Sequence, residues 1–430
     1  MGISNMVSVA DTPKDSFRLS MLIYDTRYRA ITIQTVIVLL VMAGVWWLLG
    51  NLFYNLDQLG KSPSFSFLWN RAGYDINQTL IPYTNDDTHF RAMLVGLVNT
   101  LLVAFLGCVA ATMIGVFVGV LRLSSNWLVA RLMTVYVEIF RNVPVLLWIL
   151  VAFAIFTEVT PSPRDFKVTD EMIAQGEAPA ASMLLMDSVA ITNRGTFIPS
   201  ALYSRSLGEF HIGFLPISLN TLAVLAAFVI GVLVFRAIGR RATAIQESTG
   251  VRPVVWWQRL LALFGPLLAV LIGLGFHLEY PTLGGFNFTG GILIGNSLMA
   301  LWLGLTLYTA AFIGEIVRAG IAAISKGQTE AAHALGLRPG RTMNLVILPQ
   351  ALRVIVPPLI SQYLNLTKNS SLAVAVSYMD LRGTLGGITL NQTGRELECM
   401  LLLMLIYLVI SLLISTGMNI YNNAVKLKER

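Results

Sequence analysis

Positions 327–350 read GQTEAAHALGLRPGRTMNLVILPQ and separate two long apolar runs. Glu330 to Leu335 are good helix formers, Gly336 suits the left-handed position that ends a helix, and Pro339 can open the next helix, where its missing amide costs nothing. The stretch therefore predicts two short helices joined by a bend. Such a knob of small residues is shaped to enter a groove on another protein, while a plain positively charged loop is the alternative.

The composition is that of a membrane protein. Hydrophobic residues make up 55% of the 430 residues and charged residues only 12%, against about 25% charged in soluble domains. A membrane span needs roughly 20 mainly apolar residues. The sequence therefore predicts an all-α integral membrane protein with about eight transmembrane helices, at 31–49, 93–121, 132–156, 217–238, 260–276, 297–316, 352–376 and 400–420.

Loop charges predict the orientation of these spans. With the N-terminus inside, the cytoplasmic stretches carry about twice as many lysines and arginines as the external ones, which favours N-in and C-in. Residues 1–30 are polar and lead into a retained first helix, so we expect a cytoplasmic segment rather than a cleaved signal peptide. Residues 426–430 form the cytoplasmic tail. The net charge of +7 is too dispersed for a nucleic-acid surface.

Two external segments are long. Residues 51–90 carry aromatic side chains that can anchor at the membrane interface. Residues 157–215 are rich in acidic side chains and have too little apolar patterning to predict a domain. This external insert is either a lid or docking surface, or a loosely packed connector.

The 327–349 stretch resembles the coupling loop of ABC-importer permeases, whose pattern is Glu-Ala-Ala, three residues, Gly, nine residues, Ile, one residue, Leu-Pro. Only Val346, at the Ile position, departs from it. By resemblance, this loop docks onto a cytoplasmic ATPase and transmits its closure to the membrane helices. The residues expected to couple the two proteins are Gly327, Glu330, Ala331, Ala332, Gly336 and Pro349.

Neighbouring stretches narrow the resemblance. Residues 99–101 (NTL), 136–146 (YVEIFRNVPVL), 308–321 (YTAAFIGEIVRAGI) and 368–372 (KNSSL) are similar to the polar amino-acid uptake permeases of the histidine and glutamine type. The similarity covers 91–158 and 296–425, which implies the five core spans of a type I importer permease. The extra span and loop at 31–90 and the insert with two spans at 159–295 resemble the larger general L-amino-acid and glutamate/glutamine/aspartate/asparagine transporter permeases.

The resemblance implies a permease subunit of an ATP-driven importer for polar or general L-amino acids, multi-pass in a bacterial inner membrane. The implied partners are a cytoplasmic ABC ATPase in two copies, a second related permease and a periplasmic amino-acid-binding protein. Residues 336–342 lack the lysine and spacing of a phosphate loop. We therefore expect no enzymatic activity and no cofactor in this chain, with ATP used by the partner.

Charged residues within apolar runs are candidates for the substrate path, because a retained charge there needs a partner or a water-filled cavity. Each has a simpler explanation: neighbours three residues apart can neutralise one another, and a lysine near the surface is solvated. Pro357 and Pro358 interrupt the seventh run and predict a broken helix that lines a cavity near Lys368. The candidates are Glu138, Arg141, Glu315, Lys368, Asn369 and Ser371.

An ion-gradient-driven secondary amino-acid transporter is the alternative function, since it can share the eight-span outline. It gives no reason for the Glu-Ala-Ala loop, and the sequence lacks the internal repeats of many such transporters. The four histidines are scattered among loops and predict no metal site.

Overall fold

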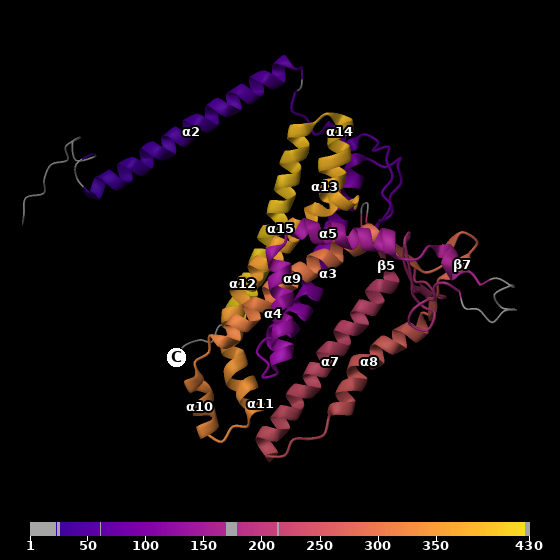
Figure 1. Ribbon diagram of the computed structural model, residues 1–430, viewed down its shortest axis with the longest axis vertical. Helices are drawn as coiled ribbons and strands as arrows, with labels where there is room; N and C mark the ends of the chain where they lie inside the picture. Colours follow the sequence, from indigo (N-terminus) through magenta and orange to yellow (C-terminus); the bar gives the residue numbers. More distant parts are fainter. Residues whose placement is uncertain (1–22, 24–25, 61, 169–178, 213–214, 426–430) are drawn as a thin grey trace, which may run out of the picture. The chain divides into compact units, whose positions relative to one another are not determined.

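A computed structural model describes residues 23, 26–60, 62–168, 179–212 and 215–425. The predicted tail 426–430 and most of the predicted lead-in 1–30 lie outside the described residues. The chain divides into two compact units, Met1–Phe65 and Ser66–Arg430. The first unit contributes α2 (Thr26–Gln58), and the second contains the other elements of Figure 1.

The predicted membrane helices are present. Across the described residues, seven helices are long and apolar enough to cross a membrane, or eight if one bent pair is a single span. This confirms the expectation of about eight spans, and their N-in/C-in orientation stays a prediction. Besides α2 they are α3 (His89–Leu121), α7 (Leu219–Thr249), α8 (Trp256–Gly273), α9 (Asn296–Ala322), the stretch Pro339–Val376 that contains α12 (Leu348–Asn369), and α15 (Glu396–Val425).

The bent pair is the third predicted span. The sequence predicts one apolar run at 132–156, but the structure has α4 (Trp127–Asn142) and α5 (Val145–Ala154), bent by 103°. Pro144 explains the break, because a proline forces the residue before it out of the helical region. Val143 is accordingly extended, with φ −107° and ψ 134°. A π-helical turn, η2 (Ile155–Val159), continues α5.

The seventh predicted span is continuous where the sequence predicts a break. Helix α12 runs through Pro357 and Pro358 without a break, so the predicted interruption at these prolines is wrong. Their missing amides remove two hydrogen bonds within the helix, but neighbouring helices commonly support a proline-containing span, and α9 and α15 both pack against α12. The helix instead tightens at its end into the 3-10 segment η5 (Ser370–Val376).

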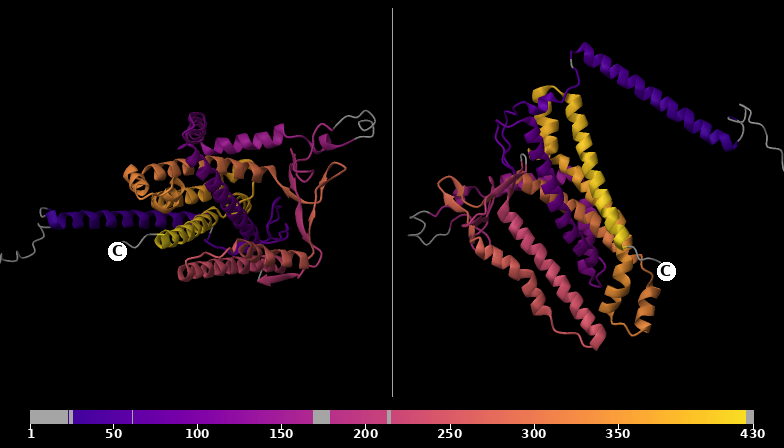
Figure 2. Two further views of the ribbon diagram at one scale, coloured as in Figure 1. Left: turned by 90° about the horizontal axis from the view of Figure 1, so that it is seen from below. Right: turned by 180° about the vertical axis from the view of Figure 1, so that it is seen from behind.

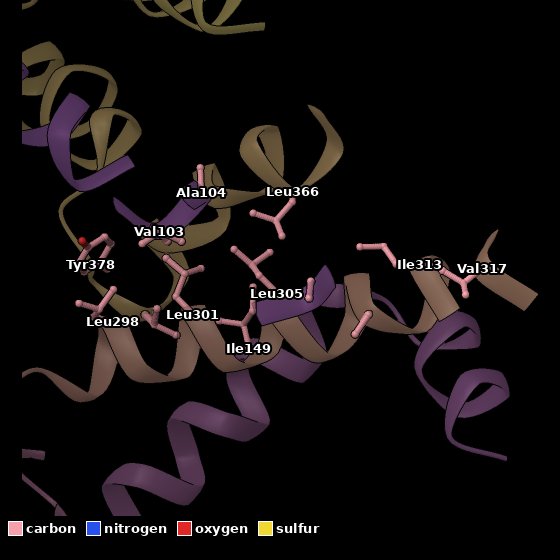
Figure 3. Packing of buried hydrophobic residues seen from close by; sticks show 14 of the residues in the cluster. Val103, Ala104, Ile149, Leu298, Leu301, Leu305, Ile313, Val317, Leu366 and Tyr378 are labelled. Carbon is pink, nitrogen blue, oxygen red and sulfur yellow. The ribbon is translucent and has the colours of Figure 1, made fainter. Parts of the chain in front are cut away.

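Helix α9 is the centre of the second unit and packs against α3, α4, α5 and α12. Its buried side chains Leu301, Leu305 and Ile313 meet Val103 of α3 and Leu366 of α12 in one continuous cluster (Figure 3). An exposed apolar surface surrounds this core. That distribution is expected of helices that face lipid on their outer side.

The insert that the sequence predicts to be external contains ordered strands in its described part. Short strands before and after the α7–α8 pair form antiparallel sheets in the order β1-β2-β9, β3-β6, β4-β5 and β7-β8. Phe197, opposite Ala190 and Leu293, is buried with Phe288 in a small core. The strands are β1 (Ala190–Thr192), β2 (Gly195–Ile198), β3 (Ser200–Tyr203), β4 (Glu209–Ile212), β5 (Leu215–Ser218), β6 (Phe276–Glu279), β7 (Thr282–Gly284), β8 (Asn287–Thr289) and β9 (Ile292–Ile294).

Helices α7 and α8 form a hairpin that follows β5 and precedes β6 along the chain. They lie side by side in Figures 1 and 2, and the Arg259 guanidinium sits 3.9 Å from the centre of the Phe235 ring. The remaining elements are short connectors: η1 (Ser66–Trp69), η3 (Pro163–Phe166), α13 (Leu381–Gly383), η6 (Thr384–Thr389) and α14 (Leu390–Thr393).

Candidate functional site

The 327–350 stretch folds into the two short helices that the sequence predicts. Helix α10 (Lys326–Ala334) is terminated by the left-handed Gly336, whose φ is +76°, and α11 (Pro339–Thr342) starts at Pro339. The Gly336 amide donates to the His333 carbonyl at 2.9 Å, and the Leu337 amide donates to the Ala332 carbonyl at 3.1 Å. This pair of bonds is the Schellman arrangement that ends helices at a left-handed glycine.

The knob, residues 326–342, presents a mixed surface. Glu330, Ala331 and Gly336 are exposed, and Leu335 at the bend is 82% exposed. Ala332 is only 3% exposed and packs inward, so among the predicted coupling residues it supports the knob's shape. A charged and apolar surface on two rigid short helices suits insertion into a protein groove. The knob connects α9 to α12 (Figure 1) through η4 (Met343–Ile347). Pro349 lies in the first turn of α12.

Glu315 lies at the centre of a charge cluster. Its carboxylate accepts hydrogen bonds from Arg318, at 2.6 Å to Oε1, and from Arg122 of the segment after α3. The Arg122 side chain is only 9% exposed. Arg318 is a neighbour three residues along the helix, the spacing at which the sequence analysis allows neutralisation. Arg122 lies 193 residues away and carries no local signal. The arrangement fixes the end of α3 against α9 through charge.

The structure does not bring the six predicted substrate-path residues together. Glu138 and Arg141 are both exposed on α4, and among the ion pairs of the described residues none joins them. Arg141 lies 5.4 Å from the Phe312 ring centre. The predicted mutual neutralisation is therefore absent. Their role in a substrate path stays a prediction.

Lys368, Asn369 and Ser371 lie together where α12 becomes η5. Lys368 is exposed, Asn369 is half-buried, and the Ser371 hydroxyl donates to the Lys368 carbonyl at 2.8 Å. This turn supplies one exposed ammonium with polar neighbours. Whether it meets substrate stays a prediction.

Asp380 is a buried acid that the sequence did not single out. It is fully buried between the last two spans, where its Oδ1 accepts from the Gly383 amide at 2.8 Å and its Oδ2 accepts from the Tyr407 hydroxyl at 3.3 Å. Burial raises the pKa of the Asp380 carboxyl to about 6. The residue caps α13 and ties it to α15.

This raised pKa predicts a pH-dependent stability. The folded state holds the Asp380 proton more tightly than the unfolded chain, whose ordinary pKa is 3.8, so this contribution to stability is largest at low pH and is lost as pH rises through about 6. Asp380→Asn keeps the Oδ1 acceptor and removes the titration. We expect wild type to lose about 1 kcal/mol relative to Asp380→Asn between about pH 5 and about pH 7.5, measured by thermal unfolding in detergent. An equal difference at both pH values would contradict this.

A polar cavity of about 480 Å³ lies at the start of α9. It is lined by Gln78 before α3, by Asn193 and Arg194 in the β1–β2 turn, and by Asn296 and Ser297 of α9, among others. It could not be predicted from local sequence, because its walls come from several segments that are far apart along the chain. The cavity lies where the insert meets the helical core.

The family described as "Binding-protein-dependent transport system inner membrane component" matches residues 111–427, which include the knob. The chain belongs to this family. It is the multi-pass membrane permease subunit of an ABC importer.

Curated relatives match the permease over nearly its whole length. "Glutamate/glutamine/aspartate/asparagine transport system permease protein BztB" of Rhodobacter capsulatus is 66% identical over 99% of this chain and 100% of its own. "General L-amino acid transport system permease protein AapQ" of Rhizobium johnstonii is 42% identical over 96% of both chains. BztC, named for the same system as BztB, is 28% identical over 43% of this chain and 39% of its own. The first two matches include α2 and the strand-forming insert, so the enlarged layout is shared.

Proposed function

We propose that this permease imports L-amino acids, among them glutamate, glutamine, aspartate and asparagine, across a bacterial inner membrane. The observation that carries the substrate class is the 66% identity over the full length of BztB, whose name states these four amino acids. An ATPase in a separate chain drives the transport. The predicted N-in/C-in orientation puts the knob on the cytoplasmic side, where that ATPase would be.

In the proposed mechanism, the knob converts closure of two ATPase copies into movement of α9 and α12. Its exposed Glu330 and Leu335 are the contact side chains, and the Schellman bend keeps the two short helices rigid. Because α9 and α12 both leave the knob and pack on one another, a push on the knob acts on the helical core. ATP must stabilise one arrangement over the other through contacts that differ between them.

The proposed complex has further members. A second related permease pairs with this chain, as the names of BztB and BztC suggest for one transport system. A periplasmic binding protein delivers the amino acid, in keeping with the family description. ATP is bound by the ATPase alone.

Glu330→Ala tests the coupling. The permease should insert and assemble normally, while ATP-dependent uptake of glutamate in proteoliposomes of the whole complex should fall about tenfold or more, within the usual range of coupling between sites. Glu247→Ala is the matched control, since Glu247 is also exposed but lies near the end of α7, outside the knob. Normal uptake by the Glu330 variant would refute coupling through this residue.

A further inference from the structure

The α7–α8 hairpin carries a cluster of arginines at its closed end, where residues 250–255 connect the two helices. From position 236 to position 259 the sequence has five arginines, no lysine or histidine, and one acidic residue, Glu247. In the part of the chain that the structure describes, no ion pair involves any of the five. This end of the hairpin therefore keeps a net positive charge that the fold does not neutralise. The arginines are Arg236, Arg240, Arg241, Arg252 and Arg259.

The length of α8 places this cluster at the membrane surface. Helix α8 has 18 residues, and at 1.5 Å per residue it spans about 27 Å, close to the thickness of the hydrocarbon core. Its first turn must then lie at the boundary between hydrocarbon and headgroups. Trp256 and Trp257 in that turn are 65% and 52% exposed, as expected of side chains that anchor at this boundary. Arg259 lies in the same turn, and α7 continues past this level toward the connecting loop (Figures 1 and 2).

Arg259 is held against α7 at this depth. Its guanidinium lies 3.9 Å from the centre of the Phe235 ring, and a Cβ at Gly239 would lie 3.3 Å from its Nη2. Stacking on a ring uses the face of a guanidinium and none of its N–H donors. Arg236 and Arg240 each follow one of these two contact residues, are exposed and lie one turn apart on the same face of α7. Three guanidinium groups are therefore gathered at the depth of the lipid phosphates.

The rest of the hairpin presents an apolar surface. Helix α8 has no buried residue, and α7 buries four of its 31 residues. The most extensive packing of the hairpin is between its two helices, and strands β4, β5 and β6 also contact it. A ligand that suits both parts of this surface has an anionic headgroup and hydrocarbon chains. The exposed apolar side chains include Leu222, Leu225, Phe228, Leu233, Leu261 and Phe264.

The use of arginine alone favours phosphate as the anion. A loop that only sets the orientation of a span needs positive charge, which lysine supplies as well as arginine. A guanidinium differs from an ammonium because its planar set of donors binds phosphate oxygens in pairs. An acidic protein surface would match the charge, but it would give no reason for the tryptophans and the apolar faces beside it. Basic pockets between membrane helices are known to bind anionic lipid headgroups.

We propose that the closed end of the α7–α8 hairpin is a binding site for an anionic phospholipid, whose phosphate is bound by Arg236, Arg240 and Arg259 and whose acyl chains lie along the exposed faces of α7 and α8. Phosphatidylglycerol and cardiolipin have the required chemistry, since no positive group in their headgroups offsets the phosphate. The lipid holds the end of the hairpin that is farther along the chain from β5 and β6. The proposal does not depend on which substrate the permease transports.

Binding of fluorescently labelled phosphatidylglycerol to the full chain in neutral detergent tests the site, with phosphatidylcholine of the same acyl chains as the comparison lipid. Wild type should bind phosphatidylglycerol more tightly than phosphatidylcholine. Arg240→Gln should weaken phosphatidylglycerol binding about fivefold, the usual effect of one arginine near an anionic lipid surface. Arg236→Gln combined with Arg240→Gln should weaken it about 25-fold. Neither variant should change phosphatidylcholine binding or the melting temperature without added lipid, because both arginines are exposed.

Arg131→Gln is the matched control. Arg131 is exposed on α4, a helix that starts with the exposed Trp127, but it lies outside the hairpin. This variant should bind phosphatidylglycerol as tightly as wild type does. Equal weakening by Arg131→Gln and Arg240→Gln would reveal a diffuse effect of net charge and overturn the proposal, as would equal wild-type affinity for the two lipids. Displacement of the labelled lipid by an equal concentration of inorganic phosphate would also overturn it, by assigning the arginines to a free anion.

Discussion

Replacing Glu315 with alanine is expected to destabilise the permease by about 2–3 kcal/mol, less than the loss of a partner from a fully buried ion pair, because the Glu315 side chain is itself 26% exposed. Glu315 is the acceptor for Arg122, whose side chain is 9% exposed, and for Arg318, which is 36% exposed. Without the carboxylate, Arg122 keeps a charge that has little access to water. Arg318 can turn outward along its flexible stem. Most of the expected cost therefore comes from Arg122.

Thermal or denaturant unfolding of the detergent-solubilised chain measures this effect. Asp86→Ala is the matched control, because it breaks the Arg71–Asp86 pair, whose side chains are 64% and 75% exposed, and such surface pairs contribute about 0–1 kcal/mol. The double variant Glu315→Ala with Arg122→Met should regain much of the loss, since it removes the unpaired charge as well. Equal unfolding of Glu315→Ala and Asp86→Ala would contradict the structural role of the cluster.

Features decided by neighbours in the sequence could be predicted. The knob follows from Gly336 and Pro339, which fix local backbone conformations whatever surrounds them. The long spans follow from composition and length. Pro144 is an equally local signal for a break in the helix. The apolar run around it nevertheless predicts one span, because hydropathy measures how apolar a segment is and does not show whether the helix bends.

Features that depend on distant residues could not be predicted. Phe197 pairs across the sheet with Leu293, far along the chain, and strands of three or four residues have no periodicity to read. The α7–α8 hairpin separates these two strands in the sequence. The sheet therefore forms only when the segments before and after the hairpin come together in the fold. The same holds for the Arg122–Glu315 pair and for the cavity wall formed by Arg194 and Asn296. The candidate substrate residues were chosen from charge alone, and charge does not reveal which helix faces meet.

Replacing Gly119 with leucine is expected to separate α3 from α9. A Cβ at this position would lie 2.6 Å from the Gly314 carbonyl oxygen and 2.7 Å from Val317 Cβ. The first of these atoms is backbone, which cannot turn aside. Membrane helices gain little from hydrophobic association and depend on such close approach of small residues. We therefore expect a loss of about 3 kcal/mol, at the upper end for an overpacked core.

Gly417→Leu provides the control, because a Cβ there meets nothing within 4 Å although the residue lies in the membrane-length helix α15. A similar melting temperature for the two leucine variants would contradict the close packing of α3 on α9. The effect on transport should follow the same order, since α9 ends at Ala322 and the knob begins at Lys326. A helix displaced at Gly314 carries the start of the knob with it. Gly119→Leu should therefore lower ATP-dependent uptake per assembled complex, whereas Gly417→Leu should leave it unchanged.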